Sequence, residues 1–175
     1  MLGEDRKSIG GVKATGFFCL LHPFNQFDDV RYWQILNLVH SNYEHNQNLH
    51  IDHIHPTSIC SSDARLRAFD VVGDIGFIIE NHNKIENLQL LQFNCNINKS
   101  NTPILNWVCQ IFNGYNRNVN DLSCVNGKQN EIEYFESNLI LIPDEKPLDE
   151  YLSIYNFKEF YENRKNILIE KLINN

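Results

Sequence analysis

The chain has 175 residues, of which 42% are hydrophobic and 21% are charged, which is ordinary for a folded globular protein of one domain. Its formal net charge is −7 at pH 7. A domain that binds nucleic acid by itself is usually basic. If this protein acts on nucleic acid, it therefore needs a partner, a fused module or a bound cation to hold the substrate. No apolar run is long enough to span a bilayer and no hydrophobic signal core is present, so we predict a cytoplasmic protein without membrane contact.

Four segments can be assigned in the N-terminal third of the chain. Residues 1–14 are polar, and we expect a loose segment there. Residues 15–21 are apolar and predict a buried strand or a short helix. Residues 28–40 carry an apolar stripe with two aspartates in the first turn, which predicts a helix. Residues 49–55 alternate polar and apolar side chains, which predicts a β-strand.

The segment after this strand is harder to assign. Residues 57–60 are expected to form a loop, after which Ser62 or Asp63 caps a short helix that runs to Phe69. The pattern of residues 74–81 fits a helix and a strand equally well.

A second strand and further helices are predicted downstream. Residues 88–91 form a short apolar run that we expect to pair with the first strand, and residues 93–99 favour a helix. Residues 103–112 favour a helix with proline at its start, and residues 113–129, rich in Asn and Gly, predict a surface excursion. Residues 156–173 predict an amphipathic helix whose basic side chains face solvent. These basic residues are Lys158, Arg164, Lys165 and Lys171.

The cysteines argue against both a disulfide framework and a structural zinc site. Their number, five, is odd, and no two of them form a CxxC pair. We therefore expect reduced thiols, as in most cytosolic proteins, and no structural zinc. The cysteines are Cys19, Cys60, Cys95, Cys109 and Cys124.

The sequence LHIDHIHP at residues 49–56 carries the clearest chemical signal. Neighbouring side chains of a strand point to opposite faces, so His50 and Asp52 share one face and His53 lies on the other. An aspartate at a strand end supplies the hard oxygen that a magnesium-type ion prefers, and a histidine facing away from the ion can deprotonate water. His50 is a candidate for a further ligand or a phosphate contact, with a hydrogen bond to a nearby loop as the alternative.

Three further residues, all downstream in the sequence, complete such a site. Asn87 directly precedes the second predicted strand, where it can fix the loop that carries the histidine. Asn96, nine positions later (96 − 87), lies on the following helix and can supply a neutral oxygen ligand. Lys99 follows by about one helical turn, so it can face the same site and contact a phosphate.

The remaining histidines are expected to be structural. His55 precedes Pro56, which favours an extended backbone at the histidine. No motif surrounds His22, His40, His45 or His82.

The set DHI-x-P, NLQLL and N-x-x-K resembles the HNH endonuclease family, whose fold is a ββα-metal finger. The resemblance implies that His53 is the general base and that Asp52 and Asn96 bind one divalent ion, Mg²⁺ in preference to Mn²⁺ or Ni²⁺. It also implies that Asn87 orients the loop of the base, and that Lys99 matches a basic position of the motif. The gap of 34 positions between the base and the middle asparagine (87 − 53) is long for the family, so residues 58–85 must contain inserted structure.

A narrower resemblance accounts for this insertion. LLHPF, HIDHIHPTS, IENLQLL, NINKSN and FKEFYENRKNILIEKL are similar to the C-terminal nuclease domain of GmrSD-type restriction proteins and their relatives in phage defence. That group carries an N-terminal ParB-like nucleotide-hydrolysing module, and we expect no such module within these 175 residues. The resemblance therefore implies a partner subunit or a fused module of that kind.

These observations predict an α+β fold with a ββα-metal (HNH) finger core wrapped by additional N- and C-terminal helices. We expect one nuclease domain over residues 15–175, with its core at about 48–101 and a C-terminal helical subdomain at about 103–175. The expected function is metal-dependent hydrolysis of DNA phosphodiester bonds in prokaryotic restriction or antiviral defence. Two alternatives remain open, namely a catalytically silent module that binds DNA or a partner, and an RNase.

Overall fold

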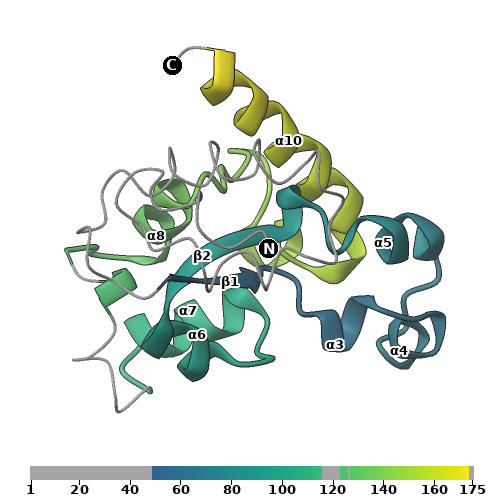
Figure 1. The fold of residues 1–175 in the computed structure, drawn as a ribbon, viewed down its shortest axis with the longest axis horizontal. Helices are drawn as coiled ribbons and strands as arrows, with labels where there is room; N and C mark the ends of the chain where they lie inside the picture. The colour runs from purple at the N-terminus through teal and green to yellow at the C-terminus, as the bar shows by residue number, and fades with distance from the viewer. Residues whose placement is uncertain (1–48, 116–122, 126, 174–175) are drawn as a thin grey trace, which may run out of the picture.

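The computed structural model describes residues 49–115, 123–125 and 127–173, which form an α+β structure with one small antiparallel sheet surrounded by helices (Figure 1). The loose segment predicted at 1–14 and the elements predicted at 15–21 and 28–40 lie outside these ranges. None of the helices within them is both long and apolar enough to cross a bilayer.

The sheet pairs two strands that are far apart in the sequence. Strand β1 covers Leu49–His53 and strand β2 covers Leu88–Gln92, and they run antiparallel with Asp52 opposite Gln89. One more bond, from Ile54 N to Asn87 O at 2.9 Å, extends the pairing past the end of β1. The predicted strand pair is therefore confirmed.

Helix α6, which covers Phe93–Lys99, begins directly after β2 and packs against both strands. It ends where Ser100 adopts φ 50° and ψ −131°, a conformation that non-glycine residues rarely adopt and that cannot continue a helix. The predicted helix at 93–99 is confirmed, and its last residue, Lys99, reaches the end of β1.

The insertion between the strands is helical. The loop predicted at 57–60 is wrong, because the Pro56 carbonyl accepts bonds from Ile59 N and Cys60 N and so starts a short helix. The next helix begins as predicted, with Ser62 Oγ accepting from Arg65 N at 3.4 Å, and the ambiguous segment at 74–81 is a helix. The elements are α3 (Thr57–Cys60), α4 (Asp63–Ala68), α5 (Ile75–Asn81) and η1 (Ile85–Asn87).

The C-terminal part is also helical, and the helices predicted at 103–112 and 156–173 are confirmed. The surface excursion predicted at 113–129 is wrong in part, because Cys124 and Val125 are buried. The elements are α7 (Ile104–Phe112), η3 (Ser123–Val125), α8 (Glu131–Ser137), α9 (Leu148–Tyr151), η4 (Ile154–Asn156) and α10 (Phe157–Ile173).

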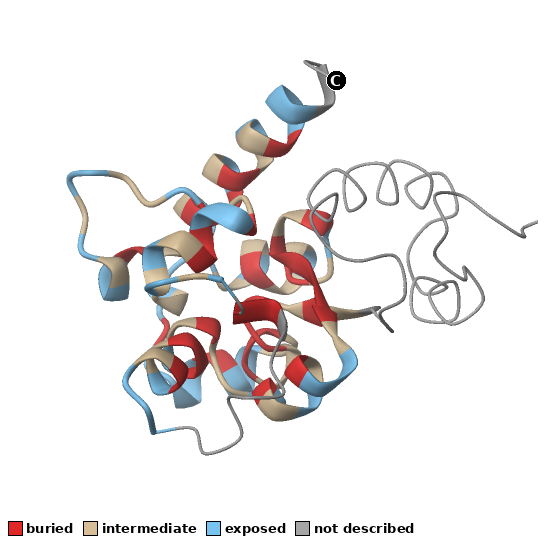
Figure 2. Cartoon of the chain, turned by 90° about the vertical axis from the view of Figure 1, so that its left-hand side faces the viewer, coloured by how far each residue is buried: buried red, intermediate tan, exposed pale blue. Residues whose placement is uncertain are grey.

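Helix α10 joins two hydrophobic clusters. The larger cluster packs Leu91 of the sheet against α7 and α8, and it includes Phe160 of α10. The smaller cluster holds the apolar side chains of α3, α4 and α5 against Phe157 and Tyr161 of the same helix. Figure 1 places these three insert helices together beside the sheet, and Figure 2 shows buried residues gathered on β2 and on the inward faces of the helices. The insertion is thus fixed to the main core by α10.

Arg164 of α10 is buried, with 1% of its surface exposed, so the predicted solvated position is wrong for this residue. Its guanidinium donates to the Glu86 carbonyl at 3.2 Å and to the Asn138 carbonyl at 3.4 Å. Burial lowers the pKa of the guanidinium to about 10. The side chain points inward because α10 packs on η1, where backbone carbonyls need a donor.

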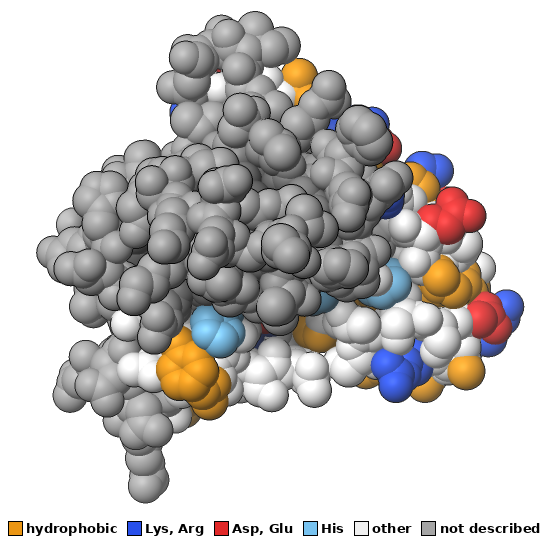
Figure 3. Space-filling view, viewed as in Figure 1, with side chains coloured by type: hydrophobic (Ala, Val, Ile, Leu, Met, Phe, Trp, Pro, Cys, Tyr) orange, Lys and Arg blue, Asp and Glu red, His pale blue; other side chains and the backbone are white. Residues whose placement is uncertain are grey.

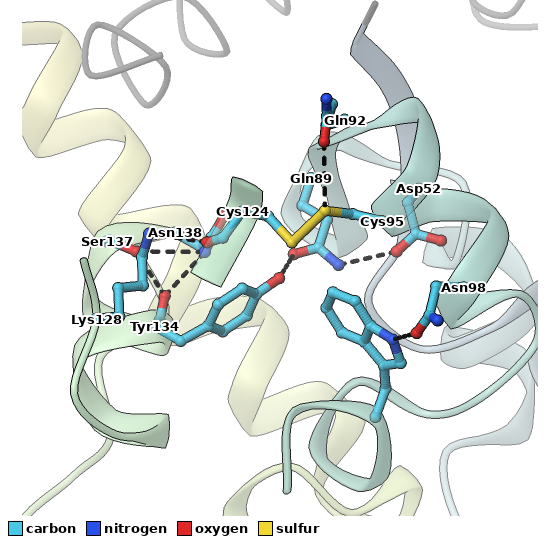
Figure 4. The surroundings of a disulfide bond; sticks show 11 residues. Asp52, Gln89, Gln92, Cys95, Asn98, Cys124, Lys128, Tyr134, Ser137 and Asn138 are labelled. Atoms are coloured by element: carbon cyan, nitrogen blue, oxygen red, sulfur yellow. Dashed lines mark hydrogen bonds between the residues drawn. A yellow bond between two sulfur atoms is a disulfide. The ribbon is translucent and has the colours of Figure 1, made fainter. Parts of the chain in front are cut away.

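A disulfide joins Cys95 of α6 to Cys124 of η3 (Figure 4). The prediction of reduced thiols is therefore wrong for this pair, although Cys60 and Cys109 are free. Both half-cystines are buried in the larger cluster. The bond links the helix that follows the sheet to a segment 29 residues away, a proximity that no sequence spacing indicated.

Reduction of this bond should lower the free energy of unfolding by about 3–4 kcal/mol, because a cross-link over such a loop restricts the unfolded chain. Urea denaturation with and without reductant measures the change. The Cys124→Ala variant should lose the dependence on reductant, and Cys109→Ser should retain it. An equal effect of reductant on the wild type and on Cys124→Ala would contradict the assignment.

Candidate active site

Asp52 lies at the centre of a buried hydrogen-bond network. Only 7% of its surface is exposed, and its Oδ2 accepts a bond from Gln89 Nε2 at 2.8 Å. Lys99 Nζ contacts both carboxylate oxygens, at 3.1 Å for Oδ1 and 3.0 Å for Oδ2. Gln89 Oε1 in turn accepts from the Tyr134 hydroxyl at 3.3 Å, so a side chain of α8 supports the carboxylate through Gln89 (Figure 4).

The Asp52–Lys99 pair is a buried ion pair. Burial raises the pKa of Asp52 and lowers the pKa of Lys99, and the contact between the two groups opposes both shifts. The Lys99 ammonium also donates to the His53 carbonyl at 2.9 Å, in addition to its bond to Asp52 Oδ1. Both charges are therefore compensated inside the protein.

His53 faces away from Asp52, as the strand alternation predicts, and it is half-buried. Its Nε2 lies 2.8 Å from Asn83 Oδ1. An amide oxygen only accepts hydrogen bonds, so Nε2 carries the proton and Nδ1 is the basic nitrogen. Burial lowers the pKa of His53, against the opposing effects of Asn83 and Asp52. The imidazole is therefore neutral at pH 7, as a general base must be.

Asn87 connects the end of β1 to the end of the insertion. The side chain is fully buried, and its Oδ1 accepts from His55 N at 2.9 Å. Its Nδ2 donates to the His55 carbonyl at 3.0 Å and to the His82 carbonyl at 2.8 Å. The ring of His82 stacks near that of His53, with 6.4 Å between centroids. Asn87 is thus placed to fix the backbone around His53, the position expected from the sequence.

The structure brings Asn96 and Lys99 onto the same side of α6, because residues three positions apart are neighbours on a helix surface. Lys99 meets Asp52, and the half-buried Asn96 lies about one helical turn before it, so the role of Asn96 as a metal ligand stays a prediction. The contact expected between Lys99 and a phosphate stays a prediction, since the ammonium is fully buried against Asp52.

His50 shares the Asp52 face of β1, and its ring packs on Phe93 of α6 at 5.1 Å between centroids. Phe93 is 43% exposed, so this ring pair lies at the surface beside the network. The predicted role of His50 in substrate binding stays a prediction.

His55 is buried among aromatic rings of α10. Its ring lies 5.2 Å from that of Phe157 and 4.9 Å from that of Phe160, and its Nε2 has no hydrogen-bond partner among the described residues. Burial lowers the pKa of this imidazole from 6.5 to about 3. These contacts fit the structural role expected from the sequence.

The donor groups suit a hard divalent ion, although they form no conventional cluster. Within the described ranges, no three His, Cys, Asp or Glu side chains lie together as metal ligands. Asp52 offers one carboxylate and Asn96 one neutral amide oxygen, which are ligands that Mg²⁺ accepts together with water and phosphate. The ammonium that lies within 3.1 Å of both oxygens of Asp52 indicates that this position favours positive charge.

Charges of both signs are mixed on the part of the surface that the structure describes. In Figure 3, Lys and Arg side chains alternate with Asp and Glu side chains, and histidine side chains reach the surface of this face. No continuous basic patch appears among the described residues in that view. This pattern agrees with the net charge of −7.

The structure adds Gln89, Asn83 and Tyr134 to the residues found from the sequence. Gln89 had a signal, because it is a polar residue within the apolar run LQLL and stands opposite Asp52 in the register. Nothing in the sequence pointed to Asn83 or Tyr134. Asn83 lies 30 residues from its partner His53, and Tyr134 lies 45 residues from its partner Gln89.

No protein-family model matches the sequence, and no curated protein matches it either.

The His55 imidazole should make stability fall at acidic pH. The unfolded chain takes up a proton near pH 6.5, whereas the folded protein does so only near pH 3, so this contribution is complete above 6.5 and is lost between 6.5 and 3. The slope approaches about 1.4 kcal/mol per pH unit. His55→Phe keeps an aromatic ring against α10 and removes this titration.

Urea denaturation at several pH values tests this expectation. The difference in free energy of unfolding between His55→Phe and the wild type should grow as the pH falls, while contributions of carboxylates cancel. Parallel pH profiles for the two proteins would show that His55 does not titrate as expected.

Proposed function

We propose that this protein is a metal-dependent endonuclease of the HNH kind, in which β1, β2 and α6 form a ββα-metal finger that hydrolyses DNA phosphodiester bonds. The observation that carries the proposal is the arrangement of Asp52 and His53. The two residues are neighbours on β1 and point to opposite faces. Asp52 is bonded to Lys99 of α6, and His53 is bonded to Asn83 of the insertion.

The sequence motif and the local geometry support each other. Asn87 precedes the strand that pairs with β1, and its amide bonds the backbone two residues beyond His53. Helix α6 follows that strand directly, its Lys99 contacts Asp52, and Asn96 lies about one helical turn before Lys99. Asn87 and Lys99 thus both bond to the end of β1, beside Asp52 and His53, which supports the proposal.

In the proposed mechanism, His53 Nδ1 accepts a proton from water as the water oxygen attacks phosphorus. Asn83 holds Nε2–H and so keeps the lone pair on Nδ1. Asp52 and Asn96 would hold the divalent ion, Mg²⁺ in preference to Mn²⁺ or Ni²⁺, which when bound stabilises charge on the phosphate and on the leaving 3′ oxygen. Gln89 and Tyr134 orient the Asp52 carboxylate.

We place this activity in prokaryotic restriction or antiviral defence, within the cytoplasm, on the basis of the GmrSD-type resemblance. The net charge of −7 supports dependence on a partner subunit or a fused ParB-like module, because phosphate attraction alone gives such a chain little affinity for DNA. An RNase activity shares the same phosphodiester chemistry, so RNA belongs in every assay as a parallel substrate.

A catalytically silent module that binds DNA or a partner is the second candidate. The Asp52–Lys99 ion pair favours it, because a lysine already compensates the carboxylate without any metal ion. The two candidates differ in whether supercoiled plasmid is converted in the presence of a divalent ion.

His53→Ala should reduce plasmid nicking in Mg²⁺ by about 10²–10⁴-fold, because the general base is lost while the half-buried side chain contributes little to folding. Gel analysis of supercoiled plasmid, with RNA in parallel, measures the change, and circular dichroism checks the fold. The variant, purified identically, also controls for a contaminating nuclease. Nicking at the wild-type rate by a folded His53→Ala protein would exclude the proposed role.

Asn83→Leu should change the tautomer of His53 and slow nicking by about tenfold, because a leucine cannot accept the Nε2–H bond. Asn83→Asp keeps an acceptor oxygen and should preserve the tautomer. Nitrogen-15 chemical shifts of the imidazole report the protonated nitrogen without reference to activity. An unchanged Nε2–H tautomer in Asn83→Leu would show that Asn83 does not set it.

A further inference from the structure

Lys99 occupies the position at which a cation meets Asp52. The side chain is 0% exposed, and its ammonium donates to Oδ1 at 3.1 Å and to the His53 carbonyl at 2.9 Å and lies 3.0 Å from Oδ2 in the same ion pair. The lysine is therefore engaged at the carboxylate and is not extended toward solvent or toward a substrate.

The carboxylate has little capacity left for another cation. Oδ2 accepts from Gln89 Nε2 at 2.8 Å and lies 3.0 Å from the ammonium, and Oδ1 accepts from that ammonium, so both oxygens already have partners. A divalent ion needs an oxygen lone pair at about 2.0–2.1 Å and approaches on the side from which hydrogen-bond donors also approach. Two cations close to one carboxylate repel each other strongly in a buried site.

We propose that the Lys99 ammonium is a built-in competitor for the divalent ion, which holds Asp52 in the metal-free protein and must leave its oxygens before the ion binds. The inference rests on the metal-dependent function proposed above and adds a control on metal affinity to it. The ion pair keeps the buried carboxylate compensated in the metal-free state, and the site gains metal only when the ion concentration is sufficient to displace the lysine.

A neutral side chain at position 99 should therefore strengthen metal binding. Lys99→Met keeps the length and apolar stem of the side chain, and Lys99→Gln keeps one donor for Asp52 without the charge. Titration calorimetry of the full chain with Mn²⁺ alone should give a Kd at least about tenfold tighter for both variants than for the wild type, because ligand charge tunes metal affinity over decades. Both variants should also gain a larger rise in Tm from Mn²⁺ than the wild type gains.

Lys128→Met is the matched control. Lys128 is partly buried and donates to the Cys124 carbonyl at 2.8 Å, but it does not contact the Asp52 carboxylate. Its replacement should leave the Kd for Mn²⁺ unchanged. Asp52→Asn, introduced beside Lys99→Gln, should remove the gain in affinity and so show that the ion binds at this carboxylate.

The outcomes separate this inference from the proposed function. An unchanged or weaker Kd in both Lys99 variants, together with plasmid nicking by the wild type in Mn²⁺, overturns the competitor role and leaves the nuclease standing. Absence of both Mn²⁺ binding and nicking in every form overturns both. Tighter Mn²⁺ binding in the variants supports the competitor role even where the wild type does not nick plasmid.

Discussion

The buried amide of Asn87 connects two backbone segments that are 27 residues apart, and the position of the site depends on it. The amide bonds both backbone groups of His55 and the carbonyl of His82. A buried group left without its bond costs about 1–3 kcal/mol, so these bonds strongly favour one arrangement. His53 lies two residues before the first bonded segment, and Asn83 one residue after the second. By holding these two segments together, the Asn87 amide also places Asn83 within hydrogen-bond distance of the His53 imidazole.

The other face of β1 carries a buried charge pair whose presence is not explained by stability. A buried ion pair seldom stabilises a fold more than apolar side chains of similar size, because both charges must leave water. Here the cost is offset by hydrogen bonds from Lys99 to Asp52 and to the His53 carbonyl, and by a further donor, Gln89, for Asp52. Such a pair is consistent with the chemical role that we propose for the carboxylate.

The C-terminal helices support the site without entering it. Tyr134 of α8 bonds Gln89, and Arg164 of α10 bonds the Glu86 carbonyl beside Asn87. The disulfide from Cys95 ties the helix that bears Lys99 to the same part of the core. Each of these contacts fixes an element that carries a candidate site residue. The helical C-terminal half is thus a frame for a sheet of only two strands, which would be marginal in water by itself.

The sequence by itself determined the local elements of the site and the chemistry of its side chains. Alternation over residues 49–55 placed Asp52 and His53 on opposite faces, and the helix after the second strand followed from its pattern, because both signals arise from neighbours in the chain. Only the tertiary structure decided that Lys99 contacts the carboxylate rather than solvent, that Asn83 bonds His53, that Arg164 is buried and that Cys95 joins Cys124. These pairings join residues from 26 to 78 positions apart. They form because a charge, donor or thiol that is buried can only find a partner that folding brings close.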